Sequence, residues 1–172
     1  MSNATQHRFK RVWFVTGASR GLGALIAQAA LANGNAVVAA GRNVRAIIER
    51  LGESSALLPV ALDVTDEEQA KRAAQAALAK FGRIDVLVNN AGFGLLAAVE
   101  ESADADVRRR YDTNVFGLLN VTRAVLPVMR GQPPIEDTLI TWPERIARRR
   151  DSGCIARRNS PSKALRKRST RS

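Results

Sequence analysis

A phosphate-binding turn is the chemistry that the glycine spacing of this chain indicates most directly. Residues 16–23 read Thr-Gly-Ala-Ser-Arg-Gly-Leu-Gly, and Gly17 allows the chain to turn tightly. Gly21 leaves room for a pyrophosphate beside the backbone, and Gly23 allows a following helix to pack closely on the preceding strand. The N–H groups at the start of that helix bind phosphate. Because Gly-rich turns also occur where strands merely meet helices, the surrounding elements have to support this interpretation.

The apolar pattern of the chain supplies those elements. Short apolar runs alternate with amphipathic or Ala-rich segments, as in parallel strands joined by helices. We expect strands at 12–15, 36–40, 57–62 and 84–88, and helices at 24–32, 44–51, 65–81 and 103–129. Thr65-Asp66-Glu67-Glu68 is typical of an N-cap followed by acidic residues in the first turn of a helix. The predicted fold class is α/β, a Rossmann-like doubly wound parallel sheet that is incomplete, with about four strands and flanking helices. The predicted divisions are a disordered N-terminus (1–10), a dinucleotide-binding domain (11–130) and an irregular, disordered basic tail (131–172).

Length and composition are those of one soluble domain. The chain has 172 residues, of which 45% are hydrophobic, and no apolar run approaches the roughly 20 residues of a membrane helix. The polar residues 1–10 lack the apolar core of a secretory signal, so we expect a cytoplasmic protein. One cysteine and one histidine exclude an internal disulfide and a Cys/His metal cluster.

The formal charge of +11 is concentrated near the C-terminus. Residues 1–130 carry a net charge of +4, and residues 131–172 carry +7. Such a tail has two interpretations. It is either a basic segment that binds nucleic acid or an acidic partner, or the Arg-, Pro- and Ser-rich product of a GC-rich strand translated out of frame. We favour the second, so nucleic acid is not the expected partner.

Four motifs, taken in order, resemble those of the short-chain dehydrogenase/reductase (SDR) family. They are the glycine turn, Asp63-Val64, Asn89-Asn90-Ala91-Gly92, and Asn114 within Thr-Asn-Val-Phe-Gly. The resemblance covers roughly residues 10–130 and implies a NAD(P)(H)-dependent oxidoreductase that transfers hydride between the nicotinamide and a small-molecule carbonyl or alcohol. It also implies adenine contact at Asp63 and a proton relay supported by Asn114. The cofactor-binding residues that it implies are Gly17, Ser19, Arg20, Gly21, Leu22, Gly23, Arg42, Asp63, Val64, Asn90, Ala91 and Gly92.

The end of the second expected strand favours NADP(H) over NAD(H). NAD enzymes place an acidic residue there for the ribose 2′-hydroxyl, whereas a 2′-phosphate calls for arginine. This chain has Gly41-Arg42-Asn43 at that position and Arg20 in the glycine turn, with no acid. Each residue also has a simpler reading when taken alone: Arg42 as a solvated turn residue, Asp63 as a helix cap, and Asn89-Asn90 as a turn former.

The catalytic pair of the SDR family is missing from the chain. The family uses Tyr-x-x-x-Lys as acid and base, with a serine about a dozen residues earlier that binds the substrate oxygen. The only tyrosine, Tyr111, is followed four residues later by Val115, and its place on an apolar helix stripe predicts a core position. Asn114 is the one remaining catalytic residue, so we expect negligible turnover.

A frameshift is our hypothesis for this departure. From Gly153 onward, the degenerate codons permit a shifted reading, Val-Tyr-Cys-Ala-Thr-Lys-Phe-Ala-Val-Glu-Gly-Leu, which contains Tyr-x-x-x-Lys at about the right distance past Asn114. The tyrosine would straddle the codons of Cys154 and Ile155, and the shift would begin between Arg130 and Gly153. The chain would then be a truncated SDR with an aberrant tail.

Loss of the later strands would have consequences for packing. The strand at 84–88 would become an exposed hydrophobic edge and the long helix would be uncovered, so we expect instability or aggregation. SDR proteins commonly form homo-oligomers through long helices, and half of that interface would be absent here. A nucleotide-binding pseudo-subunit that pairs with an intact relative is a further alternative for the function.

Overall fold

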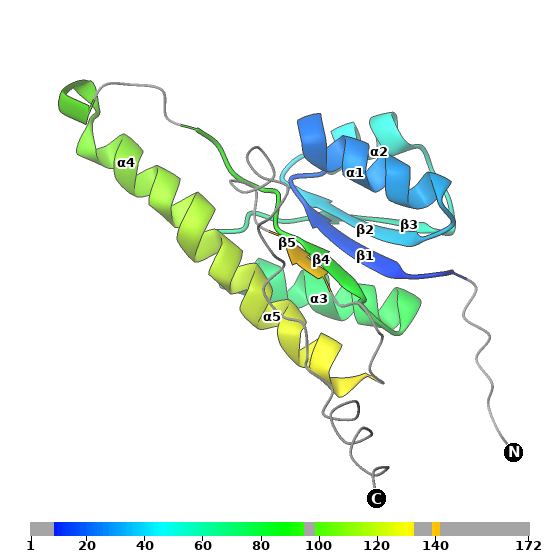
Figure 1. Cartoon of the computed structure of the whole chain (residues 1–172). Coiled ribbons are helices and arrows are strands. Elements are labelled where there is room, and N and C mark those ends of the chain that lie inside the picture. Colours follow the sequence, from blue (N-terminus) through cyan, green and yellow to red (C-terminus); the bar gives the residue numbers. More distant parts are fainter. Residues whose placement is uncertain (1–8, 95–98, 133–138, 142–172) are drawn as a thin grey trace, which may run out of the picture.

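Parallel strands and helices alternate along the chain (Figure 1). The structure is a computed structural model that describes residues 9–94, 99–132 and 139–141. Its elements are β1 (Val12–Thr16), α1 (Gly21–Ala32), β2 (Ala36–Gly41), α2 (Val44–Leu51), β3 (Leu57–Ala61), α3 (Glu67–Phe81), β4 (Val86–Val88), the 3₁₀ turn η1 (Val99–Glu101), α4 (Asp104–Tyr111), the π-helical segment η2 (Asp112–Gly117), α5 (Leu118–Gly131) and β5 (Leu139–Thr141). Among these described helices, none is long and apolar enough to cross a membrane.

The strands form one parallel sheet in the order β3-β2-β1-β4-β5. The chain runs from β1 outward through β2 to β3 and then crosses to the other side of β1 to form β4. The strand order therefore reverses between β1 and β4, and ligands of open α/β sheets bind at the carboxyl ends of the strands at such a point. The predicted Rossmann-like α/β class is confirmed.

Helices cover both faces of the sheet, with α1 and α2 on one face and α3 and α5 on the other (Figure 1). One cluster of buried hydrophobic residues lies on the first face and includes Ala27, Ile47 and Val37. Another cluster lies on the opposite face and includes Ala73 and Val121. All six residues of β2 are buried. A central parallel strand that is buried on both sides explains why its sequence is continuously apolar.

Side chains close the first turns of α2 and α3. The Asn43 side chain accepts a hydrogen bond from the Ala46 N–H at 3.0 Å. The Asp66 carboxylate accepts one from the Gln69 N–H at 2.9 Å, as expected from the acidic residues that precede this helix. Both caps satisfy N–H groups that have no partner within their helices.

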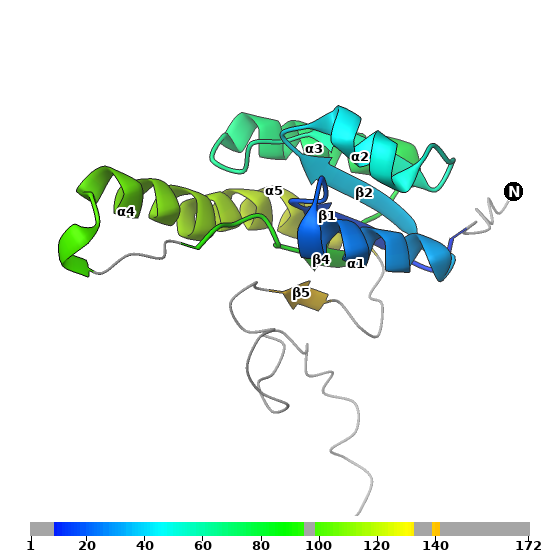
Figure 2. The same cartoon turned by 90° about the horizontal axis from the view of Figure 1, so that it is seen from above.

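The predicted long helix at 103–129 is divided by the π-helical segment η2, and the predicted core position of Tyr111 is wrong. Its side chain is 57% exposed, whereas Val121 and Val125 are fully buried. The wider π turns change the angular spacing of the residues, so an apolar stripe extrapolated through η2 does not stay on one face. In addition, α4 extends past the sheet (Figures 1 and 2), where no strand covers it.

The prediction that the fourth strand becomes an exposed edge is also wrong. Leu139–Thr141 forms β5, which pairs in parallel with β4 so that Val86 lies opposite Leu139 and Val88 opposite Thr141 (Figure 2). The N–H and C=O groups on the free side of β4 require partners, and this short run supplies them. Residues 142–172 of the basic tail lie outside the described residues, as do residues 1–8 of the N-terminus that was expected to be disordered (1–10).

Candidate functional site

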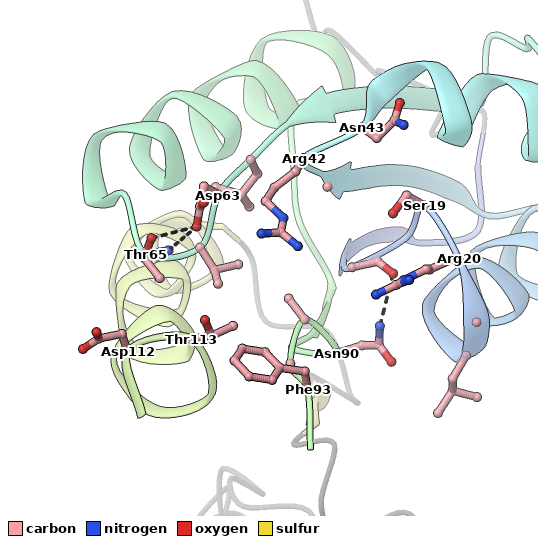
Figure 3. Close-up of a pocket in the computed structure, with 18 of the residues that line it drawn as sticks. Ser19, Arg20, Arg42, Asn43, Asp63, Thr65, Asn90, Phe93, Asp112 and Thr113 are labelled. Carbon is pink, nitrogen blue, oxygen red and sulfur yellow. Dashed lines mark hydrogen bonds between the residues drawn. The ribbon is translucent and has the colours of Figure 1, made fainter. Parts of the chain in front are cut away.

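An open cleft of about 1360 Å³ lies at the carboxyl ends of the strands. Its walls come from the loops after β1, β2, β3 and β4 and from the helical run of α4 and η2 (Figure 3). Eleven of the twelve residues expected to bind cofactor line this cleft: Gly17, Ser19, Arg20, Gly21, Leu22, Arg42, Asp63, Val64, Asn90, Ala91 and Gly92. The twelfth, Gly23, is buried. Residues distant in the sequence are thus brought to one site.

No cofactor role was predicted from the sequence for several other residues of the cleft, among them Phe93, Arg109, Thr113 and Phe116. Thr113 and Phe116 belong to the Thr-Asn-Val-Phe-Gly motif and Phe93 directly follows the Asn-Asn-Ala-Gly motif, so proximity to a motif is the signal for these three. Arg109 has no such signal. It comes from α4, and its guanidinium pairs with Asp106 at 2.7 Å.

The glycine turn has the close packing that its sequence predicts. Gly17 has a φ of 66° and Gly21 a φ of 58°, a backbone conformation that favours glycine. A Cβ on Gly23 would collide with the Gly17 carbonyl oxygen and with the Asn90 amide, whereas a Cβ on Gly21 would meet no atom within 4 Å. The turn is therefore tightly packed at Gly23 and open at Gly21, which lines the cleft.

Asn90 ties this turn to the end of β4. Its Nδ2 donates to the Thr16 carbonyl oxygen at 3.0 Å, and its backbone N–H donates to Thr16 Oγ1 at 2.9 Å. The Ala91 N–H donates to the same hydroxyl oxygen, also at 2.9 Å. Asn90 and Thr16 thereby fix the two loops that flank the switch point, so Asn90 builds the floor of the cleft.

The N-terminus of α1 opens into the cleft without a cap. Its N-cap residue is Arg20, no side chain accepts a hydrogen bond from its first turn, and that turn contains no acidic residue. Gly21 and Leu22, the first two residues of the helix, line the cleft. Unpaired N–H groups and the positive end of the helix dipole together form an anion-binding site.

Positive charge adjoins that N-terminus. Arg20 and Arg42 line the cleft, and Figure 3 shows Arg42 extending between Ser19 and Asp63. The neighbouring Asn43 uses its side chain to cap α2. Across the described ranges, no three His, Cys, Asp or Glu side chains gather as metal ligands.

Asp63 is held in a turn of its own and does not cap α3. Its Oδ1 accepts hydrogen bonds from the Thr65 N–H at 3.0 Å and the Thr65 hydroxyl at 2.7 Å. The capping position belongs to Asp66, so the alternative in which Asp63 is the helix cap is wrong. Asp63 and Thr65 together form the wall of the cleft after β3 (Figure 3).

Comparison with known proteins agrees with this geometry. The family model of short chain dehydrogenases matches residues 11–134. The chain belongs to the short-chain dehydrogenase family. It is 44% identical to Oxidoreductase BOA17 of Botryotinia fuckeliana, over 71% of this chain and 45% of the relative. It is 35% identical to 3-ketodihydrosphingosine reductase of Bacteroides thetaiotaomicron, over 70% of this chain and 42% of that protein.

Solved structures of SDR proteins have the same fold. A short-chain dehydrogenase from Streptomyces avermitilis aligns with a TM-score of 0.64 and 41% identity, covering 70% of this chain and 45% of that one. The 3-ketoacyl-(acyl-carrier-protein) reductase of Brucella melitensis in complex with NADH aligns with a TM-score of 0.69 and 32% identity, covering 77% and 56%. This SDR chain spans about half the length of the curated relatives it matches.

Asn114 of this SDR chain holds the segment that follows β4. Its Oδ1 accepts a hydrogen bond from the Phe93 N–H at 3.1 Å, and its Nδ2 donates to the Phe93 carbonyl oxygen at 2.9 Å. A Cβ on Gly92 would lie 2.9 Å from Asn114 Oδ1, so the two segments are in close contact. Asn114 does not itself line the cleft; it positions the Gly92–Phe93 wall.

Tyr111 lies apart from the large cleft. It lines a separate groove formed by α4 and η2, together with Val107, Arg108 and Phe116. Although it is the only tyrosine in the SDR chain, it is absent from the lining of the larger cleft. The described residues therefore place no tyrosine at this cleft.

Proposed function

We propose that this chain binds a nicotinamide dinucleotide with its pyrophosphate at the N-terminus of α1. The observation that carries the proposal is the uncapped first turn of α1, which meets open space beside Gly21 at the switch point of the sheet. Family membership supports the same ligand, as does the NADH bound to the Brucella melitensis relative. Asp63 and Val64 would contact the adenine, while Asn90, Ala91 and Gly92 would line the remainder of the cofactor site.

NADP(H) is the preferred dinucleotide in this proposal. Two arginines line the cleft, Arg42 directly after β2 and Arg20 at the start of α1, and a guanidinium matches a 2′-phosphate. The neighbouring Asn43 is engaged in capping α2. No acidic side chain competes at the end of β2, since Gly41-Arg42-Asn43 follows directly.

We further propose that the chain descends from oxidoreductases acting on a carbonyl or alcohol but does not turn over. A bound nicotinamide supplies a hydride donor or acceptor, while the substrate oxygen needs an acid or base. The only tyrosine lies outside the cleft, and Val115 stands where the paired lysine would follow it. Loss of a general acid or base costs about 10²–10⁴-fold in rate.

A shift of reading frame between Arg130 and Gly153 accounts for that loss in our proposal. The shifted codons after Gly153 permit Tyr-x-x-x-Lys, and the family model stops at residue 134. Sequencing the coding DNA tests this directly. Codons that do not give Tyr-x-x-x-Lys in the shifted frame would rule the frameshift out.

Binding and turnover are tested separately on the full chain. Calorimetric titration with NADPH and NADH is expected to give measurable binding of both, with NADPH tighter. Incubation with NADPH and a panel of ketones is expected to give no loss of absorbance at the reduced nicotinamide band. Failure to bind either dinucleotide would refute the cofactor site, and NADPH oxidation would refute the loss of catalysis.

A further inference from the structure

Gln132, just beyond the end of α5, uses its side chain as a substitute for a strand. Its Oε1 accepts a hydrogen bond from the Ile84 N–H at 3.1 Å, and its Nε2 donates to the Ile84 carbonyl oxygen at 2.6 Å. A carboxamide has the same donor and acceptor as a peptide group. Gln132 therefore pairs with Ile84 as a residue of a neighbouring strand would.

The position of this pair follows from the register of the sheet. The Asp85 N–H bonds to Val12 of β1, so the backbone groups of Ile84 face the opposite side, where β5 pairs with β4 from Val86 onward. Gln132 thus fills the pairing site immediately before β5. Its Nε2 also lies 3.3 Å from Asp85 Oδ1, which anchors the carboxamide a second time.

A similar arrangement occurs beyond the carboxyl end of β4, five residues after Val88. Asn114 pairs by its carboxamide with both backbone groups of Phe93, as Gln132 does with Ile84. Asn114 and Gln132 are separated by 18 residues of a helical run, about 27 Å if it were all α-helix, and the nine residues from Ile84 to Phe93 can reach about 30 Å when extended. The two contacts therefore hold the same helical run to the β4 segment at two separate points.

We propose that Gln132 is a positioning residue for the cofactor cleft. It fixes the axial position of the helical run η2–α5 at the far end of β4, and through that run it holds Asn114 on Phe93 and so sets the Gly92–Phe93 wall. A slip of one residue would move the helix by about 1.5 Å and break one of the two contacts. This inference rests on the proposed cofactor site for its functional consequence, but its structural part does not need a cofactor.

Amide hydrogen exchange of the full chain, without cofactor, tests the structural part. Gln132→Met keeps the length of the side chain and removes the carboxamide. In this variant we expect faster exchange of the Ile84 N–H. We also expect the exchange rate of the distant Phe93 N–H to rise about fivefold, and that of Val38, in the centre of the sheet, to stay unchanged. Gln75→Met, on the exposed surface of α3, is the matched control and is expected to change none of the three.

Titration with NADPH tests the functional part. We expect Gln132→Met to weaken binding about fivefold and Gln75→Met to leave it unchanged. Faster exchange at Ile84 alone, or an equal increase at Val38, would overturn the proposal, because the first is a local effect and the second a general loss of stability. If the parent binds NADPH and Gln132→Met binds it with the same affinity, the proposal is overturned as well. A parent that does not bind refutes the cofactor site and leaves the exchange result as the test of Gln132.

Should Gln132→Met fail to fold, Gln132→Asn takes its place in the same measurements. The asparagine keeps the carboxamide but is one methylene shorter, so it cannot reach both backbone groups of Ile84 from the position that Gln132 occupies. The expected exchange pattern is the same with smaller increases, and Val38 again reports general destabilisation.

Discussion

Helices α1 and α3 both begin after the carboxyl end of a parallel strand, yet their first turns differ. Asp66 caps α3, and the Gln69 side chain donates a second hydrogen bond to the same carboxylate at 2.8 Å. Glu67 and Glu68 add negative charge there. In contrast, α1 begins at Arg20 with no capping side chain and no acid. The protein caps one N-terminus with its own side chains and leaves the other open to the cleft.

We therefore expect the first turn of α3 to contribute to the stability of the fold and the first turn of α1 to contribute to binding. A side-chain cap contributes about 1 kcal/mol to the free energy of unfolding, which α3 gains and α1 forgoes. The open turn of α1 is the one that lines the cleft beside Arg42. A substitution that gives α1 the first turn of α3 should therefore increase stability and remove the binding site.

Arg20→Asp makes that change and has the largest expected effect. The new carboxylate would cap the N–H groups that otherwise face phosphate and would replace a cation by an anion. We expect NADPH affinity to fall on the order of 100-fold, measured by calorimetric titration. The midpoint of thermal unfolding is expected to rise by a few degrees.

Arg72→Asp is the matched control for Arg20→Asp. Arg72 is an exposed residue of α3 outside the cleft, and the substitution changes the net charge by the same amount. It should leave NADPH affinity within about twofold at moderate salt. Equal losses in the two variants would mean that net charge, and not the first turn of α1, controls binding.

Arg42→Ala tests the preference for NADP(H), with a smaller expected effect. Removing a guanidinium from a 2′-phosphate should weaken NADPH binding about tenfold and leave NADH nearly unchanged. Arg45→Ala is the control, since Arg45 is 89% exposed and pairs with Glu49 on α2. Similar losses for both dinucleotides would contradict a role for Arg42 at the 2′-phosphate.

The β1 to α3 region could be predicted well from sequence because its signals are local. The helix at 44–51 was predicted with its observed bounds, and the expected cap of α3 is present at Asp66. The predicted cofactor residues meet at one cleft because each follows a strand of the same parallel sheet. Their role in binding stays a prediction.

The region after β4 was predicted less well because its structure depends on distant contacts. Periodicity placed Tyr111 in the core, but the π-helical segment η2 and the absence of a strand beneath α4 leave it exposed. Leu139–Thr141 has a short apolar run that could resemble a strand, but its pairing with the edge of β4 was not predicted. Gln132 carried no motif, since its importance lies in pairing with Ile84, 48 positions away.

Asp66→Ala tests the other side of the comparison. Loss of the α3 cap leaves the Gln69 N–H without its acceptor, so the midpoint of thermal unfolding is expected to fall by a few degrees. NADPH affinity should not change, because Asp66 does not line the cleft. Circular dichroism melts and titrations on the same samples measure both. A loss of affinity at a temperature where the variant is folded would show that the two first turns are not independent.

The smallest expected effect is the pH dependence of the same cap. The backbone hydrogen bond from Gln69, followed by the one from its side chain, lowers the pKa of the Asp66 carboxyl from its ordinary value of 3.8. Its contribution to stability is therefore present above pH 3.8 and is lost as the pH falls below that value through the folded-state pKa. Asp66→Asn keeps an acceptor for the Gln69 N–H and does not titrate.

The melting temperature of the parent should thus exceed that of Asp66→Asn near pH 7, and the gap should close as the pH falls below about 3.8. Lys71, on the same helix, does not interfere in this window. Hydrogen bonds that its ammonium donates to Glu68 and then to Glu67 raise the pKa of Lys71 from 10.5, so Lys71 loses its proton only at alkaline pH. A gap that stays constant from neutral to acid pH would mean that the charge of Asp66 adds nothing to the cap, and that α3 differs from α1 only in having a hydrogen-bond acceptor at its first turn.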